Sequence, residues 1–72
     1  MTLPEIFAKN MRKYRIESGI TQEELGLLAG LHRTYIGAVE RGERNISLKN
    51  VEKISKALRV APVDLMKDEN GN

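Results

Sequence analysis

Apolar residues recur every three to four positions along most of the chain, which is the period of an α-helix. No stretch alternates strictly between apolar and polar residues, so no strand is predicted. We therefore predict an all-α fold, organised as one compact domain over residues 1–72. The expected helices are Thr2–Ser18, Gln22–Ala29, His32–Arg41, Leu48–Arg59 and Pro62–Lys67.

The stretch 21–42 organises the chain, because it has the signals of two short helices joined by a turn. Thr21 and Glu24 have the spacing of a capping box, which starts a helix. Gly30 suits a turn residue with positive φ, and Gly42 suits the left-handed residue that ends a helix. The apolar positions that would lock the two helices together are Leu25, Ala29, Leu31, Ile36 and Val39. This spacing is typical of a helix-turn-helix, whose second helix enters the major groove of DNA.

Further positions support the same fold. Thr2 and Glu5 form a second capping box, and Ser47 can cap the fourth helix. A small residue at Gly26 would let the third helix approach closely, which offsets the cost of glycine inside a helix. The inward stripes of the first and fourth helices are Ile6, Phe7, Met11 and Tyr14, and then Leu48, Val51, Ile54, Ala57 and Leu58.

Composition excludes several classes of function. The 72 residues include no cysteine and one histidine, so neither a disulfide framework nor an imidazole cluster for a metal is available. No apolar run could span a membrane, and no signal peptide is recognisable, so we expect a cytoplasmic protein. No nucleophile–base pair or phosphate loop indicates an enzyme. We predict no cofactor and no small-molecule ligand.

The net charge is only +2, but the basic residues are unevenly distributed. They gather in the first helix and in the middle of the chain, whereas the segment after residue 63 is acidic. This distribution suits a polyanion such as double-stranded DNA, although it also suits a solvated surface of mixed charge. The cations are Lys9, Arg12, Lys13, Arg15, Arg33, Arg41, Arg44 and Lys49.

The outer face of the third helix has the side chains that can read bases. Arg33 can present two donors to guanine, and Thr34 offers a hydroxyl and a methyl group. His32 is either a further base contact or a polar residue at a helix start. Gly37 and Ala38 leave the middle of this face nearly bare. The helix therefore either lies deep against the bases, with Ala38 in contact, or reads little there.

Backbone contacts are predicted around this face. The first turn of the second helix exposes N–H groups that suit a phosphate, and Gln22 either adds a donor there or faces water. Arg41 lies on the same side of the third helix as Arg33. The following loop and the start of the fourth helix add further donors to phosphate: Arg44, Asn45, Ser47 and Lys49.

Two further sets of residues have expected structural roles. Glu40 lies four positions after Ile36 on the inward side, so it needs a partner; Arg15 is the candidate, and a surface pair is the alternative. The apolar end of the chain, about residues 57–67, either completes the core or forms a subunit interface. Its predicted interface residues are Val60, Val63, Leu65 and Met66.

The positions Thr21-Gln22, Leu25, Gly30, Ile36, Glu40 and Gly42, with the segment VEKISKAL, resemble the lambda-repressor/Cro-like helix-turn-helix family. The longer segment LHRTYIGAVERGERNISLKNVEKISKAL is similar to the controller proteins of restriction–modification systems. Those are small dimeric regulators that bind paired operator sites.

The resemblance implies a five-helix fold, a two-fold dimer through the fourth and fifth helices, and the Arg15–Glu40 pair. It implies base contacts from Arg33 and Thr34, and the role of transcription regulator, with RNA polymerase as a candidate partner. Related proteins often have a polar residue at the position of Gly37. The alternatives are a phage- or plasmid-type repressor and an antitoxin-like protein-interaction module. The backbone contacts that it implies are Gln22, Tyr35, Arg44, Asn45 and Ser47.

Overall fold

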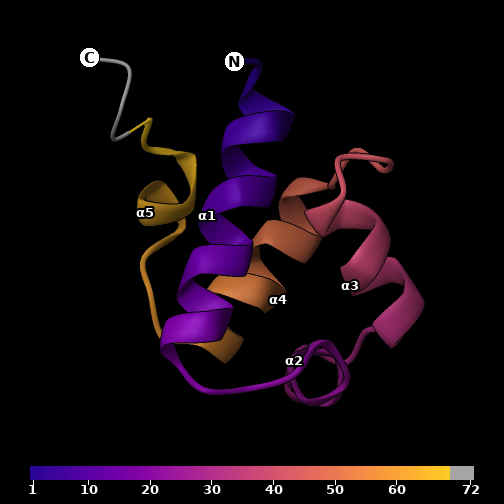
Figure 1. Ribbon diagram of the computed structural model, residues 1–72. Helices are drawn as coiled ribbons and strands as arrows, with labels where there is room; N and C mark the ends of the chain where they lie inside the picture. Colours follow the sequence, from indigo (N-terminus) through magenta and orange to yellow (C-terminus); the bar gives the residue numbers. More distant parts are fainter. Residues whose placement is uncertain (69–72) are drawn as a thin grey trace.

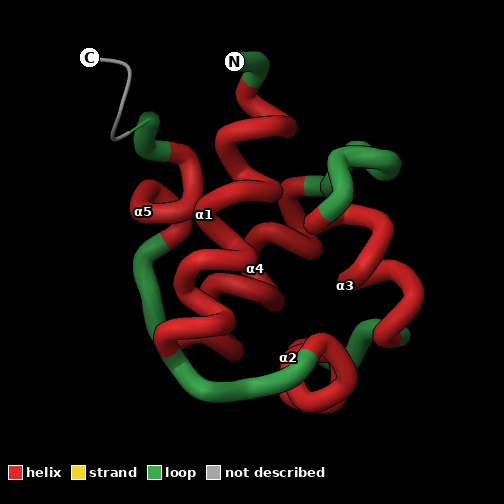
Figure 2. Tube along the Cα trace, viewed as in Figure 1, coloured by secondary structure: helices red, strands yellow, loops and turns green. Residues whose placement is uncertain are grey.

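The computed structural model describes residues 1–68, and these residues form five helices and no strand (Figures 1 and 2). The predicted all-α class is therefore confirmed. The end of the chain from Glu69 lies outside the described residues. The helices are α1 (Leu3–Glu17), α2 (Gln22–Ala29), α3 (Arg33–Glu40), α4 (Leu48–Leu58) and α5 (Pro62–Met66).

The helices begin where side chains satisfy the free N–H groups of the first turn. Both predicted capping boxes form, at Thr2 and at Thr21. Thr21 Oγ1 accepts a hydrogen bond from the N–H of Glu24 at 3.0 Å, and the Glu24 carboxylate accepts from the N–H of Thr21 at 2.9 Å. The capping residues lie just outside the helices, so the observed helices are one residue shorter at several ends than predicted.

All five helices contribute to the core, and α1 and α4 occupy the centre of the view in Figure 1. In this view α3 lies on one side of them, and α5 lies on the other side, where it packs mainly on α1. Short loops join most of the helices, and the longest loop among the described residues follows α3 (Figure 2). The large side chains that are fully buried come from all five helices: Phe7, Met11, Leu25, Ile36, Ile54 and Leu65.

One residue of the predicted inward stripes points outward. Leu48 begins α4, and 83% of its surface is exposed. The inward stripe of α4 instead starts at Val51, one turn later. Leu48 therefore contributes little to the core and is free to contact another surface.

Candidate nucleic-acid interface

Helices α2 and α3 form a tight helix-turn-helix. Gly30 ends α2 in the left-handed conformation with φ of 72°, as predicted. The next N–H, of Leu31, donates to the carbonyl oxygen of Gly26 at 2.8 Å. A Cβ atom on Gly26 would lie 2.5 Å from the Leu31 carbonyl oxygen. Glycine is thus required at residue 26 because the backbone of the turn and of the first residue of α3, Arg33, packs against it, as expected for a close approach of the third helix.

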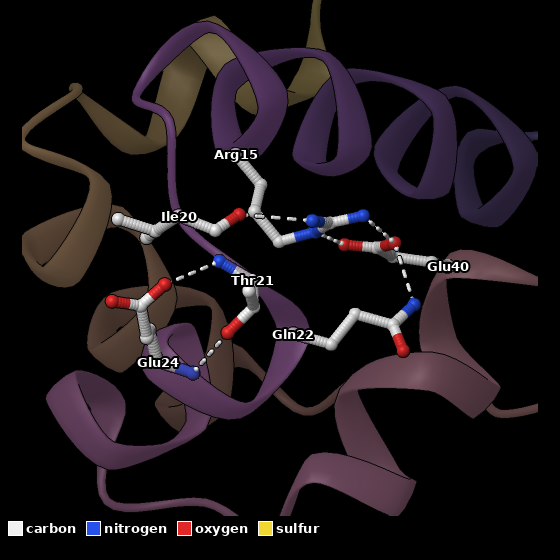
Figure 3. Close-up of polar contacts among 6 residues, drawn as sticks. All are labelled: Arg15, Ile20, Thr21, Gln22, Glu24 and Glu40. Atoms are coloured by element: carbon white, nitrogen blue, oxygen red, sulfur yellow. Dashed lines mark hydrogen bonds and ion pairs between the residues drawn. The ribbon is translucent and has the colours of Figure 1, made fainter.

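A buried ion pair attaches this unit to α1 (Figure 3). Arg15 Nε donates to Glu40 Oε2 at 2.7 Å, and a second guanidinium nitrogen donates to Glu40 Oε1 at 3.0 Å. A third donates to the carbonyl oxygen of Ile20 at 3.0 Å. The Glu40 side chain is 2% exposed and that of Arg15 is 12% exposed. The structure therefore contains the expected pair as a buried bidentate contact, not as the surface pair that was its alternative.

Gln22 is a third member of this network. Its Nε2 donates to Glu40 Oε1 at 3.0 Å, so the first residue of α2 is hydrogen-bonded to the last residue of α3 (Figure 3). One N–H of the amide is therefore used within the protein. The other N–H and the amide oxygen remain for a ligand.

The start of α3 presents Arg33 and Thr34 on the surface. Thr34 is oriented by His32, whose Nδ1 accepts from the Thr34 N–H at 3.1 Å and lies 2.8 Å from its hydroxyl oxygen. His32 is therefore the N-cap of α3, which agrees with its reading as a polar residue at a helix start. The Arg33 guanidinium is exposed and lies 3.4 Å from the Glu23 carboxylate. So long a contact between exposed groups restrains Arg33 only weakly.

The middle of α3 differs from the expected bare face. Gly37 is buried, because the side chains of Gln22 and Arg41 lie over it. Ala38 is half-buried. The expectation that Gly37 leaves the middle of this face nearly bare is therefore wrong. The reason is that long side chains on either side fold across the space that glycine leaves.

A second polar cluster joins α3, the following loop and α4. The Tyr35 hydroxyl accepts a hydrogen bond from Asn50 Nδ2 at 3.0 Å, and the Arg44 guanidinium lies 5.4 Å from the centre of the Tyr35 ring. Sequence reasoning missed Asn50. The signal was available, because Asn50 is one turn before Ile54 and is a polar residue beside an apolar stripe.

The loop and the start of α4 are exposed, and their polar groups are partly used within the protein. Ser47 caps α4 by accepting from the N–H of Asn50 at 3.1 Å. Arg41 is paired with Glu43 at 3.1 Å, and the hydrogen bond from Arg41 holds the pKa of Glu43 below its usual value. The remaining candidates for backbone contact, Asn45 and Lys49, are exposed.

The predicted subunit interface needs one correction. Leu65 is 0% exposed and belongs to the core, so its side chain cannot contact a second subunit. Val63 is exposed, and Val60 and Met66 are half-buried. Met66 also lines an apolar groove of about 140 Å³; the other lining residues are Leu3, Pro4, Phe7, Asn45, Ile46, Leu48 and Val51.

Within residues 1–68, no group of three or more His, Cys, Asp or Glu side chains is placed to hold a metal ion. None of the described helices has the length and hydropathy needed to cross a bilayer. The polar groups that the helix-turn-helix brings together are thus amides, hydroxyls and guanidinium groups, which are the donors and acceptors that contact bases and phosphates.

Comparisons with known proteins agree with this geometry. The helix-turn-helix family matches residues 11–65. The control protein C.BamHI of Bacillus amyloliquefaciens is 52% identical over 62 residues, which are 85% of this chain and 76% of that protein. The crystal structure of the restriction–modification controller protein C.AhdI from Aeromonas hydrophila superposes with a TM-score of 0.84 at 44% identity. The superposed region covers 86% of this chain and 94% of the C.AhdI chain.

The controller protein C.Esp1396I, solved as a tetramer in complex with its natural 35 base-pair operator, has a TM-score of 0.83 and 38% identity. The superposed region covers 90% of this chain and 86% of the C.Esp1396I chain. The described part of this chain and these relatives therefore share a fold over most of their length. The chain belongs to the helix-turn-helix family and, within it, to the controller proteins of restriction–modification systems.

Proposed function

We propose that this protein is a sequence-specific DNA-binding regulator of transcription that acts as a homodimer in the cytoplasm. The observation that carries the proposal is the rigid α2–α3 unit, which holds Arg33 and Thr34 on the exposed start of α3. An arginine and a threonine at this place on a recognition helix can contact guanine and thymine in the major groove. The relative C.Esp1396I binds an operator with the same fold, which supports the proposal.

Phosphate contacts would come from the residues that surround α3. Arg41, Arg44 and Lys49 are exposed cations, and the Tyr35–Asn50 hydrogen bond keeps the ring of Tyr35 against the loop that holds Arg44. Such contacts fix the position of the protein on the duplex and make its affinity dependent on salt. Base contacts from Arg33 and Thr34 would add the preference for one sequence.

The homodimer is proposed to use the surface around Leu48. Leu48 and Leu3 are exposed beside the apolar groove, and Met66 lines it. Burying this surface against a second copy would add buried apolar area to a domain that is too small to bury much by itself. A two-fold dimer would place two recognition helices about one helical turn of DNA apart, roughly 34 Å, so the operator should be palindromic.

RNA polymerase is a further proposed partner, through the exposed side of α2. Leu27 and Leu28 are both exposed there; Leu27 lines a hollow with His32 and Arg33, which leaves Leu28 as the apolar side chain for a separate contact. Replacing Leu28 by serine should leave operator affinity unchanged but alter transcription in a purified system. Unchanged transcription would remove this surface from the proposal.

Selection of bound duplexes from a random pool tests the main proposal directly. The expected result is one symmetric sequence with two half-sites. The protein should then bind the selected duplex far more tightly than a scrambled duplex at the same salt concentration. Equal affinity for the two duplexes would refute sequence-specific binding.

A further inference from the structure

Gly37 occupies the middle of α3, yet the surface over it belongs to other residues. A Cβ atom at Gly37 would lie 3.0 Å from a terminal nitrogen, Nη1, of Arg41 and 3.3 Å from Oε1 of Gln22. The neighbouring atoms nearest to that position all belong to these two side chains. The absence of a side chain at residue 37 is therefore what allows Gln22 and Arg41 to lie across the helix.

The amide of Gln22 has a fixed orientation. Its nitrogen donates to Glu40, which is itself held by two hydrogen bonds from Arg15 (Figure 3). Because the nitrogen faces Glu40, the oxygen is left on the side of Gly37. An amide held in this way offers one acceptor and one remaining N–H donor to a ligand.

Arg41 approaches Gly37 from the other side. Its Nε lies 3.1 Å from one carboxylate oxygen of Glu43, and its Nη2 donates to the other at 3.1 Å. These two contacts leave Nη1 beside Gly37. The groups at the middle of α3 are thus the Gln22 amide, which comes from α2, and one guanidinium nitrogen of Arg41.

We propose that Gly37 is a specificity-determining residue because it gives the reading of the central bases to Gln22 and Arg41. This inference rests on the proposed function and refines it. An amide with a free oxygen and a free N–H suits adenine, and a guanidinium suits guanine. Gln22 is therefore assigned to bases, in place of the phosphate contact that its position at the start of α2 suggested. Arg41 is likewise assigned to bases through Nη1, in place of the phosphate contact proposed for it above.

The first test is the single variant Gly37→Ala. Alanine at residue 37 would displace the flexible ends of two side chains rather than any backbone, and it favours the helix. The variant should keep or raise the Tm of the parent. Its affinity for the parent operator should fall about tenfold, which is the size expected for one lost base contact. Selection from a random pool should return altered central bases.

The same glycine substitution in a Gln22→Ala/Arg41→Ala background is the matched control. There it should change the affinity little, since the two side chains that it displaces are already gone. An equal loss in both backgrounds would show that the new methyl group acts on DNA directly, and would overturn the inference. Unchanged affinity and unchanged base preference of Gly37→Ala would also overturn it.

Gln22→Ala alone provides a second measurement, which does not depend on how the glycine variant folds. It should change the base preference, whereas an equal loss on operator and scrambled duplexes would show a phosphate contact and overturn the assignment. Wild-type protein without any site preference would instead refute the proposed function, and this inference with it.

Discussion

The Glu40 network permits a sharp comparison, because two of the arginine–glutamate pairs among the described residues have two contacts each and differ mainly in burial. Arg15 and Glu40 are almost fully buried, whereas the side chains of Arg41 and Glu43 are 59% and 58% exposed. The same substitution, glutamate to glutamine, can be made in each pair. It keeps the shape of the side chain, removes its charge and replaces one acceptor oxygen by an NH2 donor.

Glu40→Gln should lower the free energy of unfolding by about 3–5 kcal/mol, because it leaves the Arg15 charge buried without its counter-charge. For a chain of 72 residues, roughly 0.05–0.15 kcal/mol per residue gives a total of about 4–11 kcal/mol. The substitution would therefore remove a large part of the stability. Glu43→Gln should leave the free energy of unfolding within experimental error, since exposed ion pairs contribute little.

Urea unfolding followed by far-UV circular dichroism measures both variants, at one protein concentration because dimerisation would add to stability. If Glu40→Gln does not fold, the double variant Arg15→Met/Glu40→Leu remains informative. It should recover part of the loss, since no buried charge is left, but not all of it, because the Ile20 carbonyl and the Gln22 amide lose partners. Equal effects of the two glutamine substitutions would refute the reasoning from burial.

Three further predictions use the other surfaces. Arg33→Ala should weaken binding to the preferred duplex by about 1–3 kcal/mol and relax the base preference at one position, whereas Lys49→Ala should weaken binding to all duplexes alike. Titrations against selected and scrambled duplexes at fixed salt distinguish the two results. Leu48→Asp should fold and sediment as a monomer, because this residue is exposed in the protomer, whereas Leu65→Asp should abolish folding by placing a charge in the core. A folded Leu48→Asp dimer would place the interface elsewhere. Gly26→Ala should lower the free energy of unfolding by at least about 1–3 kcal/mol, because its Cβ would overlap a backbone carbonyl oxygen of the turn; unchanged urea unfolding would contradict this.

Local signals in the sequence were sufficient to predict the helices and the helix-turn-helix. Thr21, Glu24 and Gly30 act through contacts with residues close to them in the chain, so their roles follow from spacing. The Arg15–Glu40 pair could also be predicted, because a carboxylate on an inward stripe needs a cation.

Other features depend on tertiary packing and were not predictable in this way. The five residues of α5 are mostly apolar, and so short a helix has too few turns for a pattern to show that Leu65 faces the core and Val63 the solvent. Leu48 has the spacing of its stripe but precedes the first turn that packs. The cover over Gly37 depends on the paths of two long side chains, which no spacing rule specifies.

Asn10 helps to fix the position of the proposed dimer surface relative to the DNA-binding unit. This side chain is buried, and its Nδ2 donates to the carbonyl oxygens of Leu65 at 3.0 Å and Lys67 at 2.7 Å. Helix α1 therefore holds α5 through Asn10 and holds the α2–α3 unit through Arg15.

In a two-fold dimer, the two recognition helices must match half-sites about one turn of DNA apart. The distance between these helices depends on how α1 holds both α5 and the α2–α3 unit. Asn10→Ala should loosen α5 by leaving its last carbonyl groups without their donor. We expect weaker dimerisation in sedimentation runs and weaker binding to a full operator, but unchanged binding to a duplex with a single half-site. Ser55→Ala is the matched control, because Ser55 is also buried but its hydroxyl donates within α4, to the carbonyl oxygen of Glu52 at 2.9 Å. An equal loss of full-operator binding in the two variants would show that Asn10 acts only through overall stability, and α1 would then lose this role.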